Sequence, residues 1–60
     1  MSAVYNPQAE VMAEIQRLEA EARELRRRLT LAAGKEDRKV LSRQLEETEQ
    51  AISRLQARLD

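Results

Sequence analysis

The sequence predicts an all-α protein, folded as an antiparallel two-helix hairpin that resembles a coiled coil. Three observations predict this fold. Strong helix formers such as Ala, Leu, Arg, Glu and Gln fill most of the 60 residues. Apolar residues recur at alternating spacings of three and four, as on one face of a helix. The only glycine stands between two such series, which match each other in reverse order.

The first helix is predicted at about residues 7–33, after a short flexible arm at residues 1–6. Asn6 is a favourable N-cap, because its side chain can accept a hydrogen bond from the first turn. Pro7 suits the first helical position, where its missing N–H costs nothing. The apolar series of this helix comprises Val11, Ile15, Leu18, Ala22, Leu25, Leu29 and Ala32.

The turn is predicted at residues 34–35, because a continuous helix would carry charged side chains into apolar positions. Gly34 favours a helix end, since glycine readily adopts the left-handed conformation that stops a helix. The second helix is predicted at about residues 36–59, with Glu36 and Asp37 complementing the positive end of its dipole. Its apolar series comprises Leu41, Leu45, Thr48, Ile52, Leu55 and Leu59.

The two series pair in six layers, each joining an a position to a d position, as in an antiparallel coiled coil. The layers are Leu29 with Leu41, Leu25 with Leu45, Ala22 with Thr48, Leu18 with Ile52, Ile15 with Leu55, and Val11 with Leu59. The small middle layer either sets the distance and register of the helices or forms a notch for a partner's side chain. Thr48 can also bond the carbonyl four residues earlier.

Two helices alone leave such a seam partly uncovered. We therefore expect the hairpin to pair with a second copy into a four-helix bundle, or to be completed by another helical protein. Beside the seam, Glu14 is expected to face Arg58, and Glu19 to face Glu49. Most charge pairing is expected within each helix, in the pairs Glu19–Arg23, Glu24–Arg28 and Arg43–Glu47.

The net charge of zero conceals a dipole. Residues 23–43, the turn half, hold eight basic and three acidic side chains, and the rest of the chain holds three basic and eight acidic. These charges either form solvated helix faces that keep the protein soluble, or steer a protein partner or a second copy of the chain, or contact phosphate. The candidates for contact with phosphate or an acidic partner are Arg23, Arg26, Arg27, Arg28, Lys35, Arg38 and Lys39. The chain has no Phe or Trp for stacking on bases, which disfavours nucleic acid.

Catalytic and metal chemistry find little support in this composition. The chain has neither Cys nor His, so disulfides, Cys/His zinc sites and His or Cys catalysis are excluded. Gly34-Lys35 lacks the other residues of a phosphate loop. We expect no enzyme activity, catalytic residue, metal, cofactor or small-molecule substrate. We expect no membrane partner either, and an intracellular, cytoplasmic setting, because no long apolar run or signal peptide is present.

The open end of the hairpin offers one further surface. Val4 and Tyr5 precede the first helix, and Met12 widens its apolar stripe beside Val11 and Leu59. This cluster either caps the core or contacts a partner. Our first hypothesis is a non-catalytic protein–protein interaction module, acting through the seam as an adaptor, co-chaperone or self-associating regulator. The alternatives are a nucleic-acid-binding regulator that uses the arginine-rich tip, and a structural spacer of a longer protein.

Overall fold

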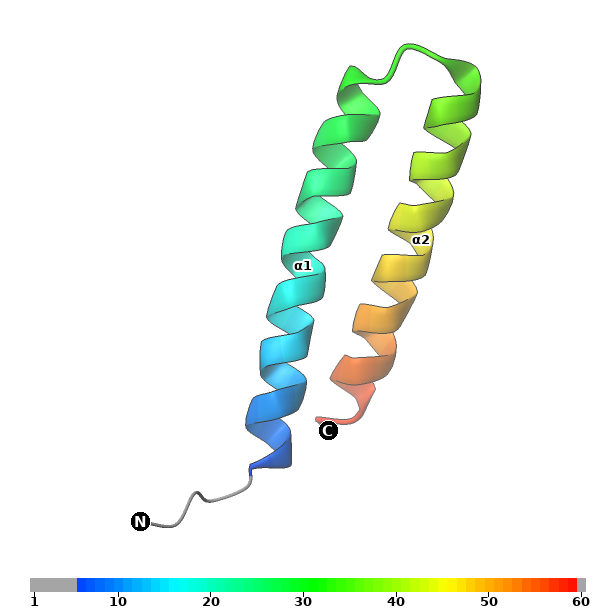
Figure 1. Ribbon diagram of the computed structural model, residues 1–60. Coiled ribbons are helices and arrows are strands. Elements are labelled where there is room, and N and C mark those ends of the chain that lie inside the picture. The colour runs from blue at the N-terminus through cyan, green and yellow to red at the C-terminus, as the bar shows by residue number, and fades with distance from the viewer. Residues whose placement is uncertain (1–5, 60) are drawn as a thin grey trace.

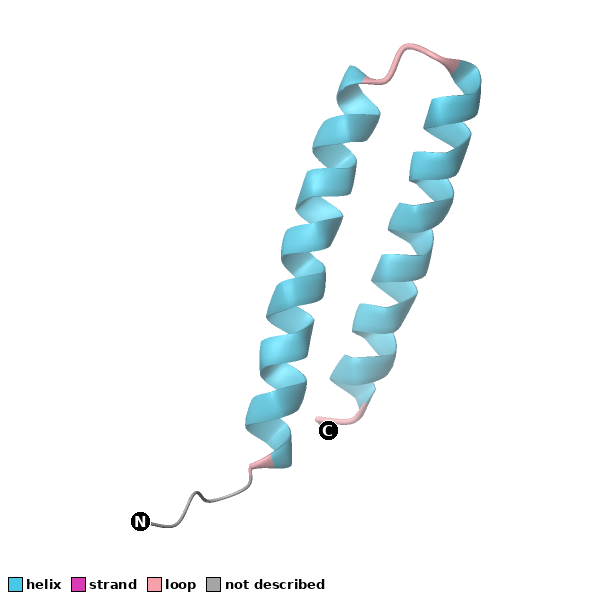
Figure 2. Ribbon diagram, in the orientation of Figure 1, coloured by secondary structure: helices cyan, strands magenta, loops and turns pink. Residues whose placement is uncertain are grey.

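The computed structural model describes residues 6–59 and consists of two antiparallel helices joined by a short loop (Figure 1). Helix α1 spans Pro7–Leu31 and helix α2 spans Lys35–Ala57. The described residues contain no strand, and only the loop and the two ends are not helical (Figure 2). The predicted all-α helical hairpin is confirmed. Neither helix is long and apolar enough to cross a membrane.

Helix α1 begins where the sequence predicts. The extended Asn6 precedes Pro7, and the Asn6 side-chain oxygen accepts a hydrogen bond of 3.1 Å from the backbone N–H of Ala9. The Asn6 carbonyl accepts another from the N–H of Glu10. These bonds satisfy donors that would otherwise face solvent at the first turn.

The end of α1 differs from the prediction. The helix stops at Leu31, two residues before the expected boundary, and Ala32 is already extended, with φ −71° and ψ 125°. The N–H of Ala32 still donates to the carbonyl of Leu29, at 3.3 Å, so the last turn is tightened. The loop therefore begins at residue 32 and not at residue 34.

The expectation of a left-handed Gly34 was wrong. Gly34 has φ −82° and ψ 139°, and it is the N-cap of α2. Its carbonyl accepts a 3.0 Å hydrogen bond from the N–H of Arg38, which closes the first turn. Lys35 consequently belongs to α2 and not to the turn, and α2 ends at Ala57, two residues before the predicted end. Glycine is tolerated at an N-cap, where the backbone is extended, although it provides no side-chain hydrogen bond to the first turn.

The two helices contact each other along the hairpin. We call the twelve residues of the six predicted layers the seam. Every one of them is buried or half-buried, whereas most other side chains of both helices are exposed. The seam is therefore the side of each helix that the fold covers, and the pairing of its residues in layers stays a prediction. We call the end with the loop the tip and the opposite end the open end.

Candidate functional site

The seam is covered only in part. Just two of the described residues are buried, Ile15 with 7% exposure and Ala22 with 2%. The other ten seam residues, seven of them leucines, are half-buried. Two packed helices cover a seam side chain only where they face each other. The side chain stays open to solvent on both faces of the hairpin, so the seam is accessible from two faces.

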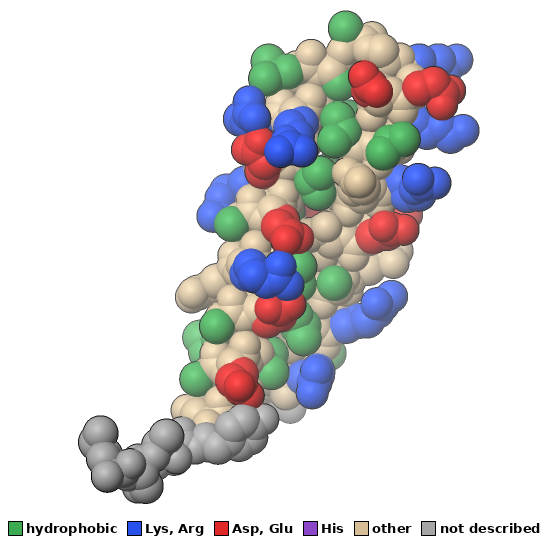
Figure 3. Space-filling model, viewed as in Figure 1, with side chains coloured by type: hydrophobic (Ala, Val, Ile, Leu, Met, Phe, Trp, Pro, Cys, Tyr) green, Lys and Arg blue, Asp and Glu red, His purple; other side chains and the backbone are tan. Residues whose placement is uncertain are grey.

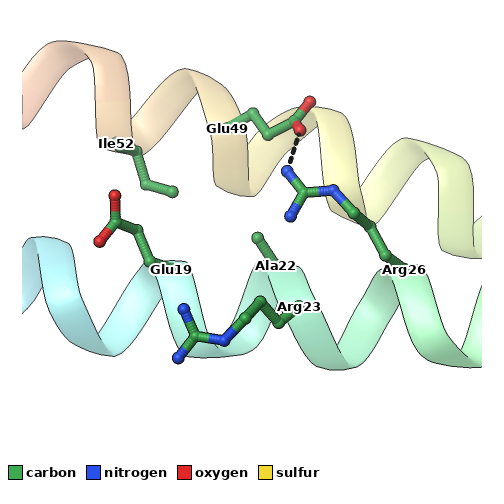
Figure 4. A pocket seen from close by; sticks show the side chains of 6 residues that line it. All are labelled: Glu19, Ala22, Arg23, Arg26, Glu49 and Ile52. Carbon is green, nitrogen blue, oxygen red and sulfur yellow. Dashed lines mark hydrogen bonds and ion pairs between the residues drawn. The ribbon is translucent and has the colours of Figure 1, made fainter.

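The first face carries a groove at the middle of the hairpin, with a volume of about 540 Å³. It is lined by Glu19, Ala22, Arg23, Arg26, Glu49 and Ile52 (Figure 4). We call this side the Arg26 face. An Arg26 Nη2 donates to Glu49 Oε2 at 2.7 Å, and this pair bridges the two helices. Glu49 is therefore paired across the hairpin with Arg26, and Glu19, which was expected to face Glu49, lines the same groove.

The middle layer at the base of this groove contains no unsatisfied polar group. Thr48 Oγ1 donates to the carbonyl of Gln44 at 2.9 Å, which is the local bond that the sequence allowed. Within residues 6–59 no buried side-chain nitrogen or oxygen lacks a partner. That this small layer sets the distance between the helices stays a prediction. A notch that receives a partner's side chain at this layer stays a prediction.

The second face carries two exposed apolar residues near the tip and a groove at the open end. Leu31 is 69% exposed and Val40 42%. Leu31 lies two residues after the seam residue Leu29, and Val40 lies one residue before Leu41. At 100° per residue both project on the same side of the seam. We call this side the Leu31 face.

The open-end groove on the Leu31 face has a volume of about 240 Å³. Its walls are formed by Pro7, Glu10, Val11, Glu14, Leu55 and Arg58. Apolar side chains lie between the two helices on the face shown in Figure 3, and charged side chains flank them. The groove therefore has an apolar floor and a charged rim.

Of the predicted open-end cluster, Met12 is 51% exposed. It follows the seam residue Val11 directly, which places it on the Arg26 face and away from the open-end groove. Val4 and Tyr5 lie outside the described residues. The cluster is therefore represented in the structure by Val11, Met12 and Leu59.

Ion pairs follow the outer side of α1. Arg17 bonds both Glu14 and Glu21, and Glu24 accepts hydrogen bonds from Arg27 and Arg28 at 2.6 and 3.0 Å. The bonds from Arg27 and then Arg28 hold the pKa of Glu24 at about 2, below its ordinary value of 4.5. All of these side chains are well exposed, so each pair contributes little to stability.

The expected intrahelical pairing is confirmed for Glu24 with Arg28. The Glu19–Arg23 and Arg43–Glu47 pairs are not among the ion pairs formed within residues 6–59, and Glu14 bonds Arg17 instead of Arg58. A hydrogen bond from Arg17 also lowers the pKa of Glu14. The partner of Glu14 is therefore the arginine one turn away and not the arginine on the other helix.

The basic residues of the tip are not gathered into one open patch. Arg26, Arg27 and Arg28 are already bound to carboxylates of the hairpin. Arg23 lines the central groove, whereas Lys35, Arg38 and Lys39 are exposed at the start of α2. No group of three or more Asp or Glu within the described part is placed to hold a metal ion.

Comparison of the chain with protein-family models, with curated proteins and with solved structures finds no match.

Proposed function

We propose that this chain is a non-catalytic protein–protein interaction module that acts through its seam. The observation that carries the proposal is the burial of the seam. It is a continuous apolar stripe on both helices, yet only Ile15 and Ala22 of its twelve residues are buried.

The uncovered seam surface is a source of binding free energy. Burying a Leu side chain completely stabilises a protein by about 1.5–3 kcal/mol relative to leaving it exposed. The seven seam leucines are half-buried, so each retains part of this free energy for a further contact. Another helical surface laid over the seam would recover it, either by completing a four-helix bundle or by placing a helix in the groove.

The charges support a protein partner in preference to nucleic acid. Three of the seven candidate phosphate-binding residues, Arg26, Arg27 and Arg28, are hydrogen-bonded to Glu24 or Glu49. A phosphate group would have to compete with these carboxylates. The role that fits best is that of a small adaptor, co-chaperone or self-associating regulator. The lack of cysteine fits a reducing, intracellular setting.

Sedimentation equilibrium over a wide range of concentration, with circular dichroism on the same samples, tests the proposal. We expect either a helical oligomer or a monomer of low helix content, because in both cases the seam needs a further surface. A fully helical, cooperatively unfolding monomer would refute the proposal. The same samples titrated with duplex and single-stranded nucleic acid test the alternative, since phosphate contacts weaken steeply with salt and an apolar seam does not.

A further inference from the structure

We propose that the surface which completes the seam is a second copy of this chain, docked antiparallel on the Leu31 face. In this dimer the tip of each copy covers the open end of the other. The inference rests on the proposed function and names the partner, the face and the orientation.

On the Leu31 face, the exposed apolar residues near the tip and the groove at the open end lie at similar distances from the middle layer. Leu31 lies nine residues after Ala22, and Glu14 lies eight residues before it. A two-fold axis across the hairpin at Ala22 therefore sets the second copy's Leu31 over the first copy's Glu14. The two residues differ by one position in their distance from Ala22, which corresponds to about 1.5 Å along the helix axis.

The same axis pairs the second helices. Val40 lies eight residues before Thr48, and Leu55 lies seven residues after it. The second copy's Val40 therefore meets Leu55, which forms a wall of the open-end groove. Leu31 and Val40 of each tip thus fall on two residues that line the open-end groove, Glu14 and Leu55, and symmetry repeats the contact at the other end.

The charge distribution selects the antiparallel orientation. The turn half of the chain has an excess of five basic residues and the rest an excess of five acidic residues. Antiparallel docking lays basic halves on acidic halves, whereas parallel docking lays like charges together. The register also places Asp37 near the second copy's Arg58.

The middle of the Leu31 face carries balanced charge. It holds Arg17, Glu21, Glu24 and Arg28 on α1 and Glu47 and Arg54 on α2, three charges of each sign. The four on α1 are paired within that helix. The Leu31 face is favoured over the Arg26 face because two of the three large apolar side chains that are exposed within residues 6–59 lie on it, whereas the Arg26 face has only Met12.

Exposed apolar side chains permit a matched test of the face. The double variant Leu31→Gln/Val40→Gln alters the Leu31 face, and Met12→Gln alters an exposed apolar residue on the Arg26 face. In sedimentation equilibrium we expect the double variant to raise the dissociation constant of the dimer at least about tenfold, and the control to change it less than about twofold. Equal effects of both variants would overturn the choice of face. Circular dichroism of each variant checks that the helices persist.

Orientation is measured with single spin labels, because the natural chain contains no cysteine. Glu36→Cys labels the tip and Gln50→Cys labels the middle of the same helix, and both positions are exposed. In the antiparallel dimer the tip labels lie on the order of 35 Å apart along the helix axis, and the middle labels lie on the order of 8 Å apart along it. A parallel dimer would bring both pairs of labels equally close, and that result would overturn the proposal.

The outcomes separate this inference from the proposed function. An antiparallel dimer weakened by the Leu31→Gln/Val40→Gln variant supports both. A monomer of low helix content would overturn the self-dimer and leave the proposed function standing, because the seam would then require another protein. A stably helical monomer would overturn both.

Discussion

Ile15 is the largest side chain that the hairpin buries, and Ile15→Ala tests whether the seam holds the two helices together. The substitution removes three carbon atoms from a side chain that is 7% exposed. At about 0.8 kcal/mol per buried carbon, the loss is about 2 kcal/mol in the free energy of unfolding. The higher helix propensity of Ala returns a few tenths of a kcal/mol, and the cavity adds to the loss.

Met12→Ala is the control, because it removes three heavy atoms from the same helix at a position that is 51% exposed. By the same reasoning it costs about 1 kcal/mol. Urea unfolding followed by circular dichroism measures both variants, at equal chain concentration because association contributes to stability. A loss for Ile15→Ala no larger than that for Met12→Ala would refute the argument that the Ile15 layer is a structural core.

Four further changes have defined outcomes. Asn6→Ala, which removes the capping bond to the first turn, is expected to cost about 1 kcal/mol by urea unfolding. Gly34→Ser is expected to be neutral or stabilising by a few tenths of a kcal/mol, because φ is −82° and a serine side chain can cap α2; a loss of about 1 kcal/mol would indicate a left-handed glycine. The pKa of Glu24 is about 2, below its ordinary value of 4.5. Its ion pairs therefore stabilise the fold above pH 4.5, and this stabilisation is lost as the pH falls toward 2. Thermal unfolding at stepped pH should show a smaller acid-induced decrease in unfolding temperature for Glu24→Gln than for the natural chain. A double-mutant cycle of Arg26→Gln and Glu49→Gln should give a coupling of about 0.2–1 kcal/mol that shrinks in high salt, since both side chains are about half exposed.

The sequence predicts the buried side of each helix more closely than the points where the helices end. The start at Pro7 follows from a cap and a proline that are both local, and the burial of the twelve seam residues follows from their heptad period. The end of α1 at Leu31 was not predicted, because Ala32 and Ala33 are good helix formers by themselves. The position of this helix end depends on the path of the loop, and that path depends on how the two helices pack against each other.

The surface charges were the least predictable part of the candidate site. Arg26 and Glu49 lie one layer or more apart in the seam register, so facing positions alone do not pair them. Helical side chains lean toward the N-terminus of their own helix. In antiparallel helices two such side chains lean toward each other, and the long Arg26 side chain then reaches Glu49 at 2.7 Å. The spacing of residues predicts where Arg26 and Glu49 lie on their helices. Whether they bond depends on the length and direction of their side chains, which the spacing does not give.

The claim most open to direct measurement is that the hairpin alone does not satisfy its seam. Helix content followed by circular dichroism on dilution, from micromolar concentration to the detection limit, tests it. We expect helix content to fall as the chain is diluted, because dissociation exposes ten half-buried seam residues that two helices cannot cover. A high helix content that stays constant at every concentration, in a chain that sediments as a monomer, would contradict the account.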